Sequence, residues 1–239
     1  MNSLSKDYRK LYLLQDKFLY WWGTLDLPFY LTGGTALGRY YLGHRYSEDL
    51  DFFVNNDVNY ARYIDKIKHD INQVFEVNLQ QALFADDFTR FFVLSDATTL
   101  KIELVNDIGY RSGAPVIYDY GLLDTPFNIL SNKLTAILSR DEPKDVFDIV
   151  YLAMSYSFNW QEVFNESKEK AVINEIDVEE RLCTFNPLML ESIDWSVEPV
   201  STDLFGRLLK QVADDFLLGA DNSLCRHNNP IQDALPLQR

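Results

Sequence analysis

The chain has 239 residues, of which 47% are hydrophobic and 14% aromatic, and this composition excludes a disordered protein. Acidic residues outnumber basic ones by 36 to 22, and the formal charge of −14 argues against a general nucleic-acid coat while suiting a protein that holds divalent metal or a cationic ligand. Two cysteines, no apolar run near the ~18 residues of a membrane span and a charged N-terminus predict a cytoplasmic protein without membrane segments.

The first part of the chain alternates helical and strand-like patterns. Apolar spacing predicts helices over residues 4–22, 35–42 and 58–74, and strands over 28–32, 49–54, 76–83, 89–94 and 99–105. This order of elements is that of a small mixed α/β sheet domain.

After about residue 125 the periodicity is helical. It predicts helices over 127–139, 144–157, 160–170, 178–185 and 202–218, with Thr202 as the N-cap of the last helix. Residues 227–239 contain turn formers and no period, so we expect a loose tail there. The expected fold is therefore α+β, with a small mixed-sheet core in residues 1–125 and a helical part in residues 126–239.

A glycine pair and two aspartates form the most informative stretch. Gly33 and Gly34 lie where a strand turns into a helix, so backbone N–H groups can approach a phosphate closely there, and the Thr35 hydroxyl would add a donor. Asp49 and Asp51 are two residues apart in a strand, and both side chains therefore point to one face. Paired carboxylates are suitable ligands for Mg²⁺.

A third carboxylate lies on a neighbouring strand. In the stretch from Leu100 to Leu104, the apolar residues face one way while Lys101 and Glu103 face the other. Glu103 can therefore join Asp49 and Asp51 across adjacent strands. The alternative is that Glu103 makes a solvent-facing salt bridge on an amphipathic strand.

A second group of charged residues follows in the helical part. Lys133 interrupts an apolar helix, Arg140 ends it, and Asp145 and Asp148 share one face of the next helix. One interpretation is that Lys133 and Arg140 neutralise a triphosphate, with Asp145 or Asp148 orienting them. The alternative is structural, because Asp145 can complement a helix dipole and Lys133 can reach water.

Taken together, these residues resemble the DNA polymerase β-like nucleotidyltransferases, whose signature is Gly-Gly or Gly-Ser followed by Asp-x-Asp. The stretch GGTALGRYYLGHRYSEDLDFF at residues 33–53 resembles most closely the AbiEii/AbiGii-type toxins of type IV toxin–antitoxin (abortive infection) systems. A later block of that family resembles a set found here: Lys133, Ala136, Arg140, Lys144, Asp145 and Asp148. The resemblance covers residues 28–155.

The resemblance implies that the helical lobe, residues 126–239, closes the active-site cleft. It also implies transfer of a nucleoside monophosphate from an NTP to an acceptor such as RNA or tRNA, with Mg²⁺ or Mn²⁺ as cofactor and a winged-helix antitoxin as partner. It assigns catalysis to Asp49, Asp51, Glu103, Lys133 and Asp148, of which Asp49, Asp51 and Glu103 hold metal. Substrate binding is assigned to Gly33, Gly34, Thr35, Arg45, Ser47, Arg140, Lys144 and Asp145. Arg45 and Ser47 are expected to brace the motif or touch phosphate, and His44 is expected to be a loop residue.

Three other functions compete with this interpretation. A small-molecule nucleotidyltransferase of the antibiotic-modifying type would draw a cationic aminoglycoside to an acidic cleft. A nucleotide-binding or partner-binding module without transfer activity is less compatible with an intact Asp-x-Asp. A glycosyltransferase also uses Asp-x-Asp for metal, but Gly-Gly-Thr upstream is not expected there.

Overall fold

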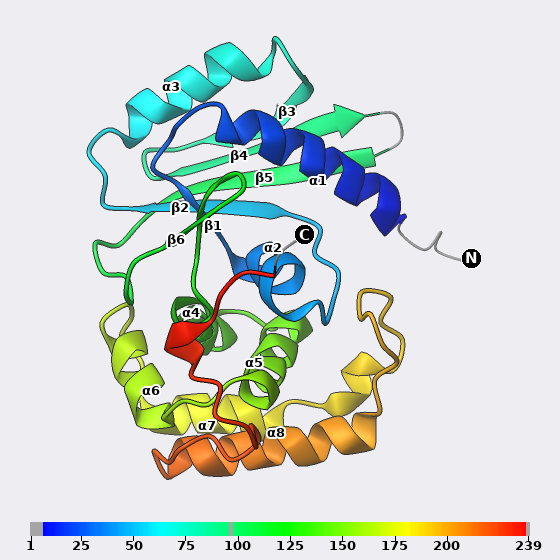
Figure 1. The fold of residues 1–239 in the computed structure, drawn as a ribbon, viewed down its shortest axis with the longest axis vertical. Helices are drawn as coiled ribbons and strands as arrows, with labels where there is room; N and C mark the ends of the chain where they lie inside the picture. Colours follow the sequence, from blue (N-terminus) through cyan, green and yellow to red (C-terminus); the bar gives the residue numbers. More distant parts are fainter. Residues whose placement is uncertain (1–6, 96–97, 238–239) are drawn as a thin grey trace. The chain divides into compact units, whose positions relative to one another are not determined.

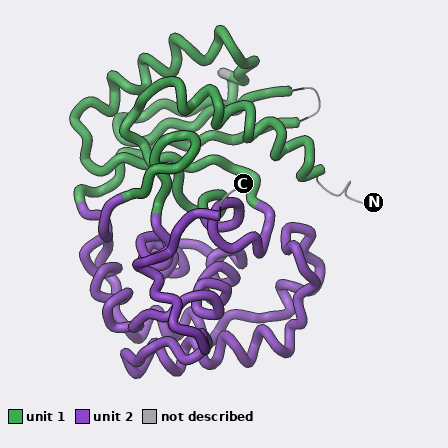
Figure 2. Tube along the Cα trace, viewed as in Figure 1, with its two compact units in different colours: residues 1–36, 47–109, 115–124 green, residues 37–46, 110–114, 125–239 purple. Residues whose placement is uncertain are grey.

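The structure is a computed structural model that describes residues 7–95 and 98–237. The chain divides into two compact units, drawn in different colours in Figure 2. The sheet unit takes in Met1–Ala36, Ser47–Gly109 and Pro115–Asp124. The helical unit takes in Leu37–Tyr46, Tyr110–Ala114 and Thr125–Arg239.

A mixed sheet forms the centre of the sheet unit. Its strands are β1 (Tyr30–Thr32), β2 (Leu50–Asn55), β3 (Glu76–Phe84), β4 (Phe88–Ser95), β5 (Thr98–Asp107), β6 (Val116–Tyr118) and β7 (Gly121–Leu123). Among the described residues the strand order is β3-β4-β5-β2-β1-β7-β6, with parallel pairs at β2–β5 and β1–β7. The five predicted strands are confirmed, whereas the three-residue strands β6 and β7 were not predicted.

One face of this sheet is covered by helices. The helices are α1 (Tyr8–Gly23) and α3 (Tyr60–Ile71), which Figure 1 shows beside the strands. Phe18 and Trp22 of α1 pack against Phe52, and the Tyr60 hydroxyl of α3 donates to the backbone carbonyl of Leu104. Alternate residues of β2, β4 and β5 are buried on this face, so the intervening polar residues lie on the other face. Helix α1 begins at Tyr8, and the first residues of the predicted helix lie outside the described residues.

The helical unit is built from packed helices. These are α4 (Pro126–Ser139), α5 (Pro143–Ser155), α6 (Trp160–Lys168), α7 (Glu175–Thr184) and α8 (Thr202–Leu217), with 3-10 turns at Pro187–Leu190 and Ile231–Asp233. Helix α2 (Gly33–Leu37) follows β1 directly and belongs to the sheet unit except for Leu37, whereas the π-helical turn that continues it, Gly38–Leu42, belongs to the helical unit. Phe147 of α5 stacks on Phe205 of α8 at the centre of the unit. The predicted α+β class, with a mixed sheet and a helical C-terminal part, is confirmed.

Two predictions about the C-terminal part are wrong. The N-cap of α8 is Ser201, whose hydroxyl accepts from the N–H of Leu204, and Thr202 is the first helical residue. The described part of the expected loose tail is packed, since Ile231 is fully buried and its N–H donates to the carbonyl of Ser157. The tail lacks a sequence period because its partners are distant in the chain.

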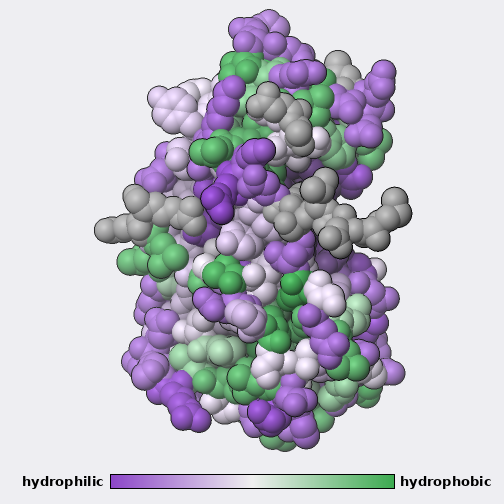
Figure 3. Space-filling view, turned by 90° about the vertical axis from the view of Figure 1, so that its right-hand side faces the viewer, coloured by the Kyte–Doolittle hydropathy of each residue, from purple (hydrophilic) through white to green (hydrophobic). Residues whose placement is uncertain are grey.

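The surface carries polar residues together with some apolar ones. On the face shown in Figure 3, apolar residues, in green, stand in small groups among polar ones, in purple. Within residues 7–95 and 98–237, none of the helices combines the length and apolar character that crossing a membrane requires.

Candidate active site

The corner between β1 and α2 brings the glycine pair against Asp51. Strand β1 pairs with β2 so that Thr32 lies opposite Asp51. Gly33, the next residue, has a φ of +67°, and a Cβ at this position would lie 3.0 Å from Asp51 Oδ2. The Thr35 hydroxyl donates to the backbone carbonyl of Asp49. The glycine-containing segment, residues 33–35, and the aspartate-containing segment, residues 49–51, are therefore in direct contact.

The three predicted metal ligands form an acidic cluster, defined as Asp49, Asp51 and Glu103. The parallel pairing of β2 and β5 places Asp51 opposite Glu103, and the carboxyl of Asp51 donates a hydrogen bond to the carboxylate of Glu103. Asp49 is connected through Lys101, whose Nζ lies 2.8 Å from Asp49 Oδ2 and 3.5 Å from Glu103 Oε1. The predicted alternation of β5 is confirmed, because Leu100, Ile102 and Leu104 are buried on one face of the strand and Lys101 and Glu103 lie on the other face.

Burial and like charges together set the protonation of the acidic cluster. Burial, together with the negative charges of Glu103 and Asp49, raises the pKa of Asp51 to about 7. Although burial opposes the shift, Lys101 and Arg90 lower the pKa of Glu103, and Arg90 Nε lies 2.7 Å from Glu103 Oε1. Asp51 is therefore the member of the cluster that holds a proton near neutral pH.

The chemistry of this cluster fits a divalent cation. Hard carboxylate oxygens are the ligands that Mg²⁺ and Mn²⁺ prefer, and such a cation would neutralise the charges of Glu103 and Asp49, which together with burial raise the pKa of Asp51. Within the described ranges, no group of three or more His, Cys, Asp and Glu has the arrangement of a ready metal site. The ammonium group of Lys101 lies between two of the three carboxylates instead.

Helix α1 braces the loop that leads into the first aspartate. The Gln15 side chain is fully buried, and its Nε2 donates to the backbone carbonyls of Ser47 at 3.0 Å and Glu48 at 3.2 Å. The N–H of Ser47 donates to the hydroxyl oxygen of Tyr12. The structure thus places Ser47 in a bracing contact through its backbone. Sequence reasoning did not find Gln15, although a polar residue on the apolar side of a helix is a signal for such a role.

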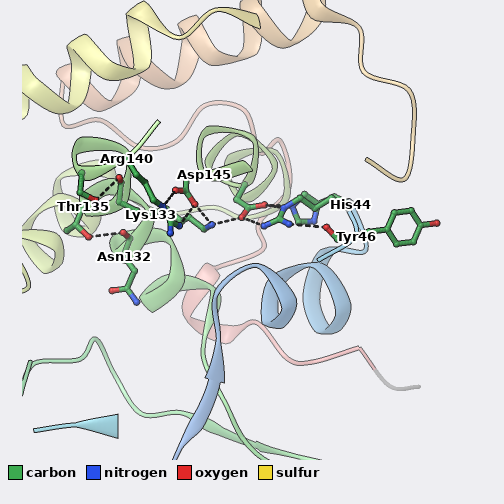
Figure 4. Close-up of polar contacts among 11 residues, drawn as sticks. His44, Tyr46, Asn132, Lys133, Thr135, Arg140 and Asp145 are labelled. Atoms are coloured by element: carbon green, nitrogen blue, oxygen red, sulfur yellow. Dashed lines mark hydrogen bonds and ion pairs between the residues drawn. The ribbon is translucent and has the colours of Figure 1, made fainter. Parts of the chain in front are cut away.

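The second predicted group forms a buried network in the helical unit (Figure 4). Lys133 Nζ of α4 lies 2.6 Å from Asp145 Oδ1 and 2.7 Å from Asp148 Oδ2, both of α5. Arg140 forms a bidentate pair with Asp145, at 2.7 and 2.9 Å. Asp145 and Asp148 are three residues apart and therefore share one face of α5, where both carboxylates contact Lys133.

The loop before β2 enters the same network. Arg45 donates to both oxygens of Asp148, from Nε at 2.6 Å and from a terminal nitrogen at 2.7 Å. His44 is a loop residue, as predicted, but it is also buried, with Nε2 2.8 Å from Asp148 Oδ1. Asp148 is fully buried, yet Arg45 and Lys133 hold its pKa well below the usual range, and burial lowers the pKa of His44. We call these six residues the helical network: His44, Arg45, Lys133, Arg140, Asp145 and Asp148.

The helical network carries a surplus of positive charge. With His44 neutral, its three cations, Lys133, Arg45 and Arg140, face two carboxylates. The Lys133 side chain is 7% exposed, whereas that of Arg140 is 59% exposed. Lys144 lies elsewhere, with Nζ over the ring of Trp195. The geometry therefore leaves the Arg140 guanidinium as the member of the network that an external anion reaches first.

The structure sorts the predicted site residues into two sets. The sheet unit holds Gly33, Gly34, Thr35, Ser47, Asp49, Asp51 and Glu103, and the helical unit holds Arg45, Lys133, Arg140, Lys144, Asp145 and Asp148. Sequence reasoning missed the counter-ions of the acidic cluster, Lys101 and Arg90, and the contact of His44 with Asp148. Lys101 was noticed only as the neighbour of Glu103 on one strand face.

Solved structures of low sequence identity share this fold. JHP933 from Helicobacter pylori is 21% identical with a TM-score of 0.57, over 90% of this chain and 95% of that one. A putative nucleotidyltransferase from H. pylori is 20% identical with a TM-score of 0.55, over 90% and 97%. MenT4, the nucleotidyltransferase toxin Rv2826c from Mycobacterium tuberculosis H37Rv, is 16% identical with a TM-score of 0.52, over 91% and 86%.

The family of the chain follows from its sequence over nearly the whole length. No curated protein matches the chain. A family model described as the nucleotidyl transferase AbiEii toxin of type IV toxin–antitoxin systems matches residues 18–235. That range includes every predicted site residue and most of both units. The chain therefore belongs to the AbiEii family of nucleotidyltransferase toxins.

Proposed function

We propose that this protein transfers a nucleoside monophosphate from an NTP to an RNA acceptor, with tRNA as the leading candidate, in a reaction that requires Mg²⁺ or Mn²⁺. The family supports nucleotidyl transfer. The single observation that carries the metal requirement is the acidic cluster beside Gly33, in which Asp51 is hydrogen-bonded to Glu103 and lies against the glycine corner.

The sheet unit would provide the reacting centre. When bound by Asp49, Asp51 and Glu103, a divalent cation supplies activation of the acceptor hydroxyl and charge neutralisation for the triphosphate. Asp51 must lose the proton it shares with Glu103 to become a ligand. Gly33 and Gly34 leave their backbone without side-chain cover, while the Thr35 hydroxyl keeps Asp49 in position by donating to its carbonyl.

The helical network would provide positive charge for the triphosphate. Arg140 would add the charge of a planar guanidinium that is already paired with Asp145, whereas Lys133 would act as a point charge. Asp145 positions both cations, since it contacts each of them, and Asp148 positions Lys133. Arg45 keeps Asp148 ionised in a site where burial alone would protonate it.

A transfer assay with matched variants tests the proposal. The purified protein is incubated with each labelled NTP and Mg²⁺, together with either total tRNA or kanamycin as acceptor. We expect label on tRNA, and at least a ~10³-fold lower rate for Asp51→Asn, since an electrostatic stabiliser is lost. Asp86→Asn serves as the control, because Asp86 is exposed in the turn between β3 and β4.

The acceptor decides between the candidate functions. The charge of −14 favours a cationic small molecule as a second candidate, and label moving only to kanamycin would establish it and exclude the RNA acceptor. Binding of NTP without incorporation into either acceptor would identify a nucleotide-binding module instead. Unchanged transfer after chelation of divalent ions would refute the metal requirement.

The proposed partner is an antitoxin, as the type IV family implies. We propose that it is a winged-helix protein encoded next to this gene. Expression of this chain alone should slow bacterial growth, and co-expression of the neighbouring reading frame should restore growth. The variant Asp51→Asn should be harmless in both cases, which would attribute the toxicity to nucleotidyl transfer.

A further inference from the structure

Lys101 occupies an unusual place in the acidic cluster. It lies on β5 two residues before Glu103, and therefore on the same face of the sheet. Its Nζ is 2.8 Å from Asp49 Oδ2 and 3.5 Å from Glu103 Oε1, so one ammonium group bridges the carboxylate from before β2 and the carboxylate from β5. These are two of the three groups that the proposed function assigns to a divalent cation.

The bridge differs from an ordinary surface ion pair. The side chains of Lys101, Glu103 and Asp49 are 29%, 17% and 37% exposed, so the Glu103 end of the contact is partly shielded from solvent while the Asp49 end is more open. Three carboxylates meet here, and without a cation between them their mutual repulsion would destabilise the folded state. Lys101 supplies that cation from within the chain.

Arg90 provides an internal comparison. It lies opposite Glu103 on β4, and its Nε contacts the same Oε1 atom at 2.7 Å. Arg90 and Lys101 therefore each place one positive charge against Glu103, but among the described residues no ion pair joins Arg90 to Asp49. Of these two cations, only the lysine lies between two proposed metal ligands.

We propose that Lys101 is a built-in substitute for the divalent cation, one that holds Asp49 and Glu103 together in the metal-free protein and must withdraw when metal binds. This inference rests on the proposed function, because it assumes that the acidic cluster is the metal site. Metal binding then exchanges one cation for another, and Lys101 sets the metal concentration at which the exchange occurs.

Direct measurement of metal binding tests the exchange. Mn²⁺ is titrated into the full-length protein without nucleotide, and free Mn²⁺ is followed by electron paramagnetic resonance. We expect Lys101→Met to lower the Kd for Mn²⁺ by about tenfold, since a competing ion pair is removed. Arg90→Met removes an equal charge from Glu103 without freeing Asp49, and its Kd should change by less than about threefold. Lys101→Arg retains a cation and should bind Mn²⁺ nearly as wild type does.

Thermal unfolding supplies a second measurement that does not depend on activity. In the presence of chelator, Lys101→Met should melt below wild type, because the carboxylates have lost their internal cation. Added Mn²⁺ should then raise its Tm by more than it raises that of wild type. Lys101→Gln serves in place of the methionine variant if the latter does not fold.

The outcomes separate this inference from the proposed function. A Kd for Lys101→Met equal to or weaker than wild type overturns the exchange, and so does equal tightening by Arg90→Met, which would reflect net charge alone. If wild type binds Mn²⁺ and labels RNA while the lysine variant shows no tightening, only the exchange is refuted. If wild type neither binds Mn²⁺ nor transfers a nucleotide, both are refuted.

Discussion

Gly33 and Asp51 lie so close together that a side chain at one position would displace the other. Gly33 has a left-handed φ of +67°, a conformation that costs an L-residue about 1 kcal/mol. A Cβ atom added at this position would lie only 3.0 Å from Asp51 Oδ2. Backbone conformation and carboxylate placement are therefore set by the same residue.

We predict that Gly33→Ala abolishes most transfer activity while Gly113→Ala does not. Gly113 has a φ of +68°, and a methyl group added there would meet no atom within 4 Å, so this position incurs the backbone cost alone. Gly113→Ala should lose about 1 kcal/mol of unfolding free energy in urea titrations, and Gly33→Ala should lose at least as much. A rate for Gly33→Ala equal to that of Gly113→Ala would show that the approach to Asp51 is unimportant.

The raised pKa of Asp51 predicts a specific pH dependence of stability. The folded state binds its proton up to about pH 7, whereas the unfolded chain releases it near 3.8. Because the folded state holds the extra proton within this window, its contribution to the unfolding free energy falls as the pH rises and levels off above about 7.

The measurement is a series of urea titrations from about pH 4 to pH 8 in chelator, with wild type compared to Asp51→Asn. Glu103, Asp145 and Asp148 have lowered pKa values and contribute with the opposite slope in both proteins, so the difference between the two proteins isolates Asp51. Parallel curves would show that the Asp51 pKa is not raised.

At the scale of elements, α5 organises the helical network. It contributes Asp145 and Asp148 from one face, and these join α4 through Lys133 and the loop before β2 through Arg45. Removing one carboxylate from such a buried set leaves a cation without compensation, which is more costly than the loss of a surface pair.

We predict that Asp148→Asn lowers the unfolding free energy by about 3–5 kcal/mol, because Arg45 would remain buried with a neutral partner. Asp141→Asn is the matched control, since Asp141 pairs with Arg181 at a position where its side chain is 82% exposed. The control should change stability by less than about 0.5 kcal/mol in the same urea titration. Equal losses of unfolding free energy in the two variants would show that Asp148 contributes no more to stability than an exposed ion pair does.

The sequence predicted the elements in which apolar residues recur with the period of a helix or a strand. Alternation along β2 and β5 placed Asp51 and Glu103 on one face correctly, and helical spacing located α4 to α8. It did not predict the three-residue strands β6 and β7, or the packed tail, which depends on Ser157. The N-cap of α8 was misplaced by one residue because Ser201 and Thr202 are both capping types.

The candidate site was likewise predicted only in part from the sequence. Motif spacing identified Asp49, Asp51 and the helical cations because they lie within two short stretches of the chain, residues 33–53 and 133–148. It did not identify which charges pair. The contacts of Lys101 with Asp49 and of His44 with Asp148 form only when separate segments fold together, so the sequence contains no local signal for them.

At the scale of the whole molecule, the path of the chain connects the two units repeatedly. It passes between them after residues 36, 46, 109, 114 and 124. The helical unit therefore includes short segments that precede its main body, and the network around Asp148 draws His44 and Arg45 from one of them.

We predict that a fragment of residues 126–239 does not fold by itself. It lacks His44 and Arg45, so Asp148 would be buried with Lys133 but without these two partners. Its proton–nitrogen correlation spectrum should be poorly dispersed, and its thermal unfolding should not be cooperative. The control is the full chain cleaved at residue 125 after folding, which keeps every segment. A well-dispersed spectrum from the isolated fragment would show that residues 126–239 are an autonomous domain.

The packed C-terminal segment has a consequence for synthesis on the ribosome. The Leu237 N–H donates to the carbonyl of Tyr40, and Ile231 fills a position in the interior of the helical unit. The π-helical turn that contains Tyr40 emerges early in translation, but Leu237, its hydrogen-bond partner, emerges nearly two hundred residues later. A nascent chain therefore cannot complete the packing of this unit until residue 237 has left the exit tunnel.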